Sequence, residues 1–203
     1  LPETFHYKRG KIWTLRPNQQ QVVDNFSNAI KIGRKNLLMY AVMRFGKSYT
    51  SLCCALEMDA KIVLVVSAKA DVKDEWKKTV ESAGNFYQYI FIDADDLLNN
   101  ENIIKETIRN GIKVVLFITL QDIQGETIKG KHKQLFKEKI DLLVVDETHF
   151  GARGESYGKV LKDVKSENNN LKKLSDESIN LNKANEDLKK INARIKLHLS
   201  GTP

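Results

Sequence analysis

The most informative part of this chain runs from Asn36 to Ser48 and has the sequence NLLMYAVMRFGKS. It starts as an apolar run that predicts a buried strand over residues 36–42, and it ends in Gly-Lys-Ser where a helical pattern begins. Phosphate-binding loops place a glycine, a lysine and a hydroxyl residue between a strand and a helix in this way. The backbone N–H groups of such a turn and of the helix N-terminus face bound phosphate. The stretch therefore predicts a nucleotide-binding turn.

Each residue type in this turn has its own predicted role. Gly46 lets the backbone approach the phosphates closely, Lys47 bridges the β- and γ-phosphates, and Ser48 ligates Mg²⁺. Arg44 contacts phosphate, nucleic acid or only water, and these alternatives stay open at this point. The predicted nucleotide-binding set also includes two neighbours of these residues, Phe45 and Tyr49.

A second informative stretch, DLLVVDETH, covers residues 141–149. Its apolar run predicts a buried strand that brings Asp146 and Glu147 to its carboxyl end. There Asp146 would hold Mg²⁺ through water, and Glu147 would polarise the attacking water. The alternative is that the two carboxylates only cap a turn. His149 completes the predicted catalytic set, although a surface or hydrogen-bonded histidine fits its position nearly as well.

Short apolar runs alternate with helical stretches along most of the chain. The runs predict strands over Asn36–Val42, Lys61–Ser67, Tyr89–Asp93, Lys113–Thr119, Asp141–Asp146 and Ile195–Ser200. The stretches between them predict helices over Asn18–Lys31, Lys47–Met58, Val72–Ala83, Asp96–Asn110 and about Lys131–Lys139. Near-continuous apolar runs are typical of parallel strands buried on both faces. The pattern therefore predicts an α/β fold with a doubly wound, mainly parallel sheet and helices on both faces.

The composition limits the possible settings and partners. The chain has 203 residues, which predicts one α/β domain, and its net charge of +7 mildly favours a polyanionic partner. Cys53 and Cys54 are neighbours and cannot form an ordinary structural disulfide, so they predict two small buried residues and a reducing, cytoplasmic setting. No apolar run is long enough to span a membrane, which predicts no membrane partner.

One polar region interrupts the alternation of strands and helices. Residues 162–192 are dominated by Lys, Asn, Glu and Ser. Apolar residues recur in it at every seventh position, at Leu174, Leu181, Leu188 and Ile195. The companion positions are polar, which makes a coiled-coil seam poor. We therefore predict a peripheral insertion, either a solvated helical hairpin or a mobile loop.

Several segments in order resemble the conserved motifs of superfamily 2 helicases and translocases. Asp146–His149 resembles a DEAH-type motif II, and Ser200-Gly-Thr-Pro203 resembles motif III. Further segments in matching order are Leu15–Gln19, Val65–Lys69 and Thr119–Gln121. The nearest resemblance is to the helicase subunit of type III restriction enzymes and to related phage and defence helicases. The resemblance implies a single RecA-like, ATP-binding P-loop NTPase domain over residues 1–203.

The resemblance also implies roles for individual residues. Gln19 would hydrogen-bond adenine, which makes ATP with Mg²⁺ the expected cofactor. The residues implied to contact nucleic acid are Lys69, Thr119 and Gln121, and those implied to couple hydrolysis to movement are Ser200 and Thr202. Two upstream aromatic residues would either stack on adenine or belong to the core, namely Tyr7 and Trp13.

Relatives of this kind have a second RecA-like domain, in cis or in trans, that supplies an arginine finger. Without it the transition state lacks a stabilising contribution on the order of 10³ in rate, so we expect slow hydrolysis by the chain alone. Two other readings stay open: a phosphotransferase of another P-loop class, and a nucleotide-binding module without turnover. DNA is favoured over RNA as the track only by the family resemblance.

Overall fold

The computed structural model describes residues 10–42, 44–123, 133–146, 188 and 190–201, and the fold is given for these. Six parallel strands form one sheet in the order β1-β6-β5-β2-β4-β3. Their bounds are Asn36–Tyr40 for β1, Ile62–Ser67 for β2, Tyr89–Ile92 for β3, Lys113–Thr119 for β4, Ile140–Asp146 for β5 and Ala193–Ser200 for β6. The predicted parallel α/β sheet is confirmed, and each predicted strand lies within two residues of an observed one.

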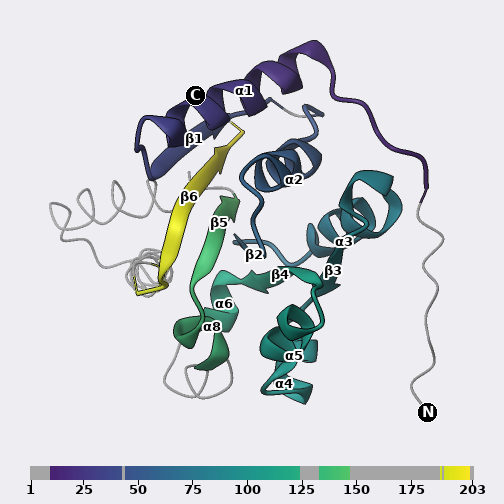
Figure 1. Cartoon of the computed structure of the whole chain (residues 1–203), viewed down its shortest axis with the longest axis vertical. Coiled ribbons are helices and arrows are strands. Elements are labelled where there is room, and N and C mark those ends of the chain that lie inside the picture. Colours follow the sequence, from purple (N-terminus) through teal and green to yellow (C-terminus); the bar gives the residue numbers. More distant parts are fainter. Residues whose placement is uncertain (1–9, 43, 124–132, 147–187, 189, 202–203) are drawn as a thin grey trace, which may run out of the picture.

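Helices cover both faces of this sheet (Figure 1). The first face is covered by α1 (Pro17–Lys31), α2 (Lys47–Glu57) and α3 (Lys73–Ser82), whose apolar residues share one core with the sheet. The second face is covered by α4 (Ala94–Asn99), α5 (Ile103–Arg109), α6 (Leu120–Ile123) and α8 (Lys133–Lys137). A short 3₁₀ helix, η1 (Gly84–Phe86), follows α3. The central strand β2 is buried at every residue, because both of its faces are covered.

The helix predicted over Asp96–Asn110 is wrong in its extent. The segment forms two helices, because Asn100 adopts an extended backbone conformation that ends α4. Asp93 starts α4 two residues earlier than predicted, since its side chain accepts hydrogen bonds from the backbone N–H groups of Asp95 and Asp96. The short helix α6 directly after β4 was not predicted, because four residues are too few for a periodic pattern.

The structure describes residues 188 and 190–192 at the end of the region that was predicted as a polar insertion over about 162–192. Leu188 and Ile191 are buried in the core on the second face of the sheet. The backbone N–H of Ile140 donates to the carbonyl of Asn192 at 2.9 Å, which ties this segment to the start of β5. The apolar side chains at 188 and 191 therefore belong to the domain, and β6 starts at Ala193. The rest of the predicted insertion lies outside the described residues.

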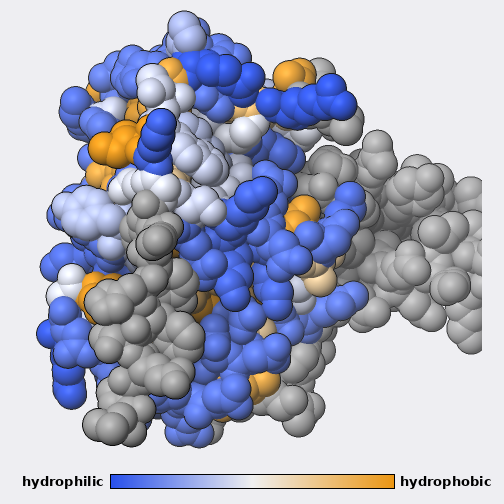
Figure 2. All heavy atoms as spheres, turned by 90° about the vertical axis from the view of Figure 1, so that its right-hand side faces the viewer, coloured by the Kyte–Doolittle hydropathy of each residue, from blue (hydrophilic) through white to orange (hydrophobic). Residues whose placement is uncertain are grey.

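The surface turned toward the viewer in Figure 2 is dominated by hydrophilic side chains, with small and separate apolar groups. Cys53 and Cys54 are buried in the core, as predicted, and burial raises the pKa of the Cys53 thiol to about 11. Among the helices that the structure describes, none has the length and hydropathy needed to cross a membrane.

Candidate functional site

The candidate site lies at the carboxyl edge of the sheet, where several strands end side by side. β6 lies between β1 and β5, so Ser200 is brought next to Tyr40 at the end of β1. On the other side of β5, Ser67 is paired in register with Asp146 and also with Thr119 of β4. Residues far apart in the sequence therefore meet at one edge, which is where open α/β sheets bind ligands.

The turn between β1 and α2 has an unusual backbone. Arg44 and Gly46 both have positive φ angles, 64° and 85°. α2 begins at Lys47, and its N-cap is Gly46, which has no side chain to accept hydrogen bonds from the first helical turn. The N–H groups at this helix start are therefore oriented to bind an anion.

The start of α1 holds this turn through backbone carbonyls. The Gln19 amide Nε2 donates to the carbonyl oxygen of Phe45 at 2.7 Å. The Arg16 guanidinium also donates to the Phe45 carbonyl, and to that of Arg44 at 3.3 Å. A Cβ at position 46 would lie only 2.8 Å from Gln19 Nε2, so the close approach of the turn to α1 requires glycine there.

Gln19 itself is 4% exposed. Its Oε1 accepts from the backbone N–H of Arg16 at 2.9 Å, while its Nε2 is bonded to the turn. Gln19 was predicted to contact adenine, and its link to the turn between β1 and α2 was not predicted. No sequence signal marks the link, because the two partners are 26 positions apart.

A cation and a carboxylate from separate elements meet beside the turn. Lys47 Nζ lies 3.6 Å from Asp146 Oδ1. The lysine side chain is 26% exposed and the aspartate side chain 7%, so the pair stands at the rim of the site with the carboxylate inside. The structure thus brings together the lysine that was predicted to bind phosphate and the aspartate that was predicted to hold Mg²⁺.

Ser48 has a partner that the sequence did not predict. Its hydroxyl donates to Glu75 Oε1 on α3 at 2.7 Å. The only sequence signal for this residue is the acidic pair Asp74 and Glu75 at the start of α3, which is also common at helix N-termini without any function.

Two other members of the predicted nucleotide-binding set pack into the protein. Phe45 is buried in the core, and Tyr49 packs its ring against Trp13 and Phe86, with centroids 5.4 Å and 5.9 Å away. The Tyr49 hydroxyl donates to the carbonyl of Trp13, and burial raises its pKa. One helical position separates Tyr49 from Ser48, which turns its side chain by about 100° around the helix axis. Trp13 contacts Tyr49, but the residue is 38% exposed and belongs to neither core cluster.

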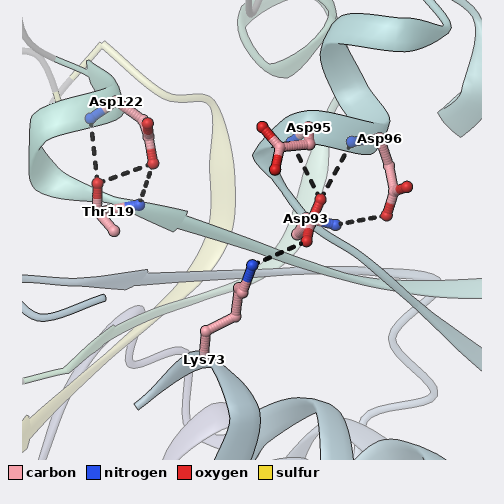
Figure 3. Close-up of polar contacts among 6 residues, drawn as sticks. All are labelled: Lys73, Asp93, Asp95, Asp96, Thr119 and Asp122. Carbon is pink, nitrogen blue, oxygen red and sulfur yellow. Dashed lines mark hydrogen bonds and ion pairs between the residues drawn. The ribbon is translucent and has the colours of Figure 1, made fainter. Parts of the chain in front are cut away.

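The polar residues that follow β3 and β4 form compact groups of their own (Figure 3). The Thr119 hydroxyl and backbone N–H both donate to Asp122 Oδ2, at 2.8 Å and 2.7 Å. Lys73 Nζ lies 3.1 Å from Asp93 Oδ2. Burial alone would raise the pKa of Asp93, but hydrogen bonds from the Asp96 backbone and from Lys73 outweigh it and lower the pKa.

The remaining predicted residues are placed as follows. Lys69 and Gln121 are exposed near the ends of β2 and β4. Ser200 is buried at the end of β6, and its carbonyl accepts from the backbone N–H of Ala41 at 2.9 Å. Arg44 is exposed in the turn. Four residues with a predicted role lie outside the described ones, namely Tyr7, Glu147, His149 and Thr202.

Comparison with known protein families places the chain. A family model described as "Type III restriction enzyme, res subunit" matches residues 12–203. The chain belongs to this family. The sequence resemblance to superfamily 2 helicases is thereby confirmed, and the predicted RecA-like fold with it.

Solved structures similar to this res-subunit domain share its fold at low sequence identity. The type ISP restriction-modification enzyme LlaBIII bound to DNA has a TM-score of 0.64 at 16% identity, over 95% of this chain and 13% of that one. The Sulfolobus solfataricus SWI2/SNF2 ATPase core domain has a TM-score of 0.59 at 14% identity, over 94% of this chain and 32% of that one. The UvsW helicase from bacteriophage T4 has a TM-score of 0.51 at 18% identity, over 96% of this chain and 55% of that one. The chain thus spans less than two thirds of each of these proteins. No curated protein matches it in sequence.

Proposed function

We propose that this chain is the ATP-binding first motor domain of an ATP-dependent DNA helicase or translocase. The observation that carries the proposal is the meeting of Lys47 and Asp146, 3.6 Å apart, beside the glycine turn that starts α2. A cation next to oriented N–H groups, with a carboxylate at a neighbouring strand end, is what a magnesium–nucleotide site requires. The family match supports a motor domain over other P-loop enzymes.

The residues present fit ATP with Mg²⁺. The turn allows a phosphate to approach the backbone, since position 46 has no side chain. Mg²⁺ usually keeps several waters and takes only one or two carboxylates besides substrate phosphates. Within the described part of the chain there is no group of three or more potential metal-ligating side chains, which accords with such a sparsely ligated ion. Bound Mg²⁺ would offset the charge that develops on the transferred phosphoryl group.

Each side chain then has a defined task. Lys47 binds the β- and γ-phosphates and gives up part of its interaction with Asp146 when it does so. Asp146 and Ser48 hold the magnesium ion, and Glu147 orients and polarises the attacking water. His149 stays in the proposed catalytic set as a neighbour of these carboxylates in the sequence.

Gln19 retains its proposed contact with adenine. A primary amide has two N–H donors and two acceptor lone pairs on its oxygen. The Gln19 amide uses one donor on Phe45 and one lone pair on Arg16, so each end of the amide keeps capacity for a nucleobase. The same side chain would then contact the base and hold the loop that binds the phosphates.

The nucleic-acid track is proposed to follow the carboxyl edge near the ends of β2 and β4. Lys69 and Gln121 are exposed there and suit contacts to a phosphate backbone. The Thr119 hydroxyl donates to Asp122, so we expect Thr119 to support nucleic-acid binding through the shape of the turn that it closes. Ser200 and Thr202 would couple the nucleotide site to the nucleic-acid track. Strand β6, which ends at Ser200, lies between β1, which leads into the proposed phosphate loop, and β5, which ends at Asp146.

Completion of the motor is proposed to require a second RecA-like domain, in cis or in trans. That domain would supply the positive charge that stabilises the transition state of hydrolysis. We therefore expect this chain by itself to bind ATP and to hydrolyse it slowly.

Binding of a fluorescent ATP analogue in the presence of Mg²⁺ tests the proposal. We expect saturable binding that ATP displaces better than GTP, and a loss of this preference in Gln19→Ala. Lys47→Ala should weaken binding by about tenfold to a hundredfold, because a hydrogen bond to a charged group contributes about 1.5–3 kcal/mol. Lys78→Ala, an exposed lysine on α3, is the matched control and should bind as the unmodified chain does. Equal binding by both lysine variants would refute the proposed phosphate site.

A further inference from the structure

The hydroxyl of Ser48 is already engaged by a carboxylate from another helix. Ser48 lies in the first turn of α2, Glu75 lies in the first turn of α3, and their oxygens are 2.7 Å apart. This distance is typical of a hydrogen bond from a hydroxyl group to an oxygen acceptor. Ser48 is 4% exposed, so the bond is shielded from water on the serine side.

The chemistry of a hydroxyl gives this contact a consequence. A serine hydroxyl has one proton and two lone pairs. When its oxygen ligates a cation, the proton must point away from the ion, and an acceptor on that side fixes the orientation. We infer that Glu75 is a positioning residue: its carboxylate accepts a hydrogen bond from the Ser48 hydroxyl and so orients the oxygen lone pairs of Ser48 toward Mg²⁺. The inference rests on the proposed nucleotide site.

Other acidic residues near the site are engaged differently. Asp146 faces the ammonium group of Lys47. Asp74 is the neighbour of Glu75 in the same helical turn, but it is the Glu75 carboxylate that accepts the hydrogen bond from the Ser48 hydroxyl.

The position of Glu75 is fixed by the packing of α3. Trp76 is almost fully buried in the core and anchors this turn of the helix. The Thr79 hydroxyl donates to the Glu75 carbonyl at 2.8 Å, one turn further along α3. Lys73, at the start of the same helix, is paired with Asp93. The carboxylate of Glu75 is therefore presented to Ser48 by a rigid helix.

The test compares nucleotide affinity with and without Mg²⁺. A fluorescent ADP analogue is titrated into the unmodified chain, Glu75→Ala, Glu75→Gln and the control Asp74→Ala, in Mg²⁺ and in EDTA. Mg²⁺ should raise the nucleotide affinity of the unmodified chain above its value in EDTA. We expect this increase to be about tenfold to a hundredfold smaller in Glu75→Ala, which is the usual effect of removing a residue that hydrogen-bonds to a metal ligand. Glu75→Gln keeps an acceptor oxygen and should retain most of the gain. All four proteins should have equal affinity in EDTA, which shows that the site itself is intact.

Three results would overturn the inference. The first is a Mg²⁺ gain in Glu75→Ala equal to that of the unmodified chain, and the second is a larger gain, which would mean that Glu75 holds Ser48 away from the ion. The third is an additive loss in the double variant. If Glu75 acts through Ser48, Ser48→Ala should lose the Mg²⁺-dependent gain as well, and adding Glu75→Ala to it should cause no further loss. Lys47→Ala separates this outcome from a failure of the proposed function, because affinity unchanged by Lys47→Ala in both conditions would refute the nucleotide site and the inference together.

Discussion

The turn after β1 and the turns after β3 and β4 stand at the same edge of one sheet, yet they are built in different ways. The turn after β4 is closed by residues three positions apart, through the bonds between Thr119 and Asp122. The turn after β3 is closed in the same way by Asp93 and Asp96, with one further bond from Lys73 (Figure 3). The turn after β1 is held instead by α1, and its polar side chains meet partners on β5 and α3.

This difference accords with the proposal that the turn after β1 binds the nucleotide. A local cap satisfies the first N–H groups of a helix with its own side chain and leaves little for another molecule to bind. The turn after β1 keeps positive φ angles and a glycine N-cap, so its helix start stays without a capping side chain. Such a backbone costs free energy, which α1 offsets with the bonds from Gln19 and Arg16.

Gly46→Ala should give the largest effect on this comparison. The substitution adds a Cβ at positive φ and only 2.8 Å from Gln19 Nε2, so the Gln19 amide must leave its place on the Phe45 carbonyl or the turn must move, and nucleotide affinity should be lost. Gly33→Ala is the matched control, since Gly33 has φ of 86° and nothing within 4 Å of an added Cβ. Both variants should lose about 1–2 kcal/mol of unfolding free energy from the backbone conformation, measured by chemical denaturation. Unimpaired nucleotide binding by Gly46→Ala would contradict the account of the turn.

Gln19→Ala should have the next largest effect. It removes the donor to the Phe45 carbonyl and the acceptor of the Arg16 N–H, so we expect a loss of about 1–3 kcal/mol in unfolding free energy. Gln20→Ala is the control, because Gln20 is exposed and bonds only to Asp24 on its own helix; it should change stability by less than about 0.5 kcal/mol. Equal losses in the two variants would show that α1 does not hold the loop.

Asp93 tests the turn after β3, which is closed by neighbouring residues, and its substitution should have the smallest effect. Asp93→Ala removes the cap of α4 and should cost about 1 kcal/mol, with nucleotide affinity unchanged. The pKa of Asp93 is lowered in the folded state, so its contribution is complete above the unfolded pKa of about 3.9 and is lost as the pH falls through the folded pKa. Denaturation curves from pH 7 down into this range should therefore converge for the two proteins. If the unfolding free energies of the unmodified chain and Asp93→Ala differed by the same amount down to the lowest pH, the stabilising charge would not be that of Asp93.

The sequence predicted those parts of the molecule that depend on local patterns. Continuous apolar runs predicted all six strands, because strands buried on both faces contain few polar residues. The Gly-Lys-Ser turn and Asp146 were predicted because their chemistry is confined to short motifs at strand ends. The break between α4 and α5 was missed, since Asn100 ends a helix only through the extended conformation that its surroundings impose.

The contacts between distant elements could not be predicted. Gln19 and Glu75 reach the phosphate loop through the packing of α1 and α3 against α2, over separations of 26 and 27 positions. Tyr49 was expected beside the nucleotide because it follows Ser48, whereas the rotation of the helix directs it to Trp13. Position in a motif predicts the chemistry of a residue, but packing decides which way its side chain points.

Calorimetric titration of the chain with ATP and Mg²⁺, beside Lys47→Ala and Asp146→Asn, tests the central claim most directly. The account predicts saturable one-site binding by the unmodified chain. It further predicts loss of binding in Lys47→Ala, and in Asp146→Asn a loss confined to the part of the affinity that depends on Mg²⁺. Binding that is equally strong in all three proteins, or no binding by the folded unmodified chain, would contradict the assignment of this sheet edge as the nucleotide site.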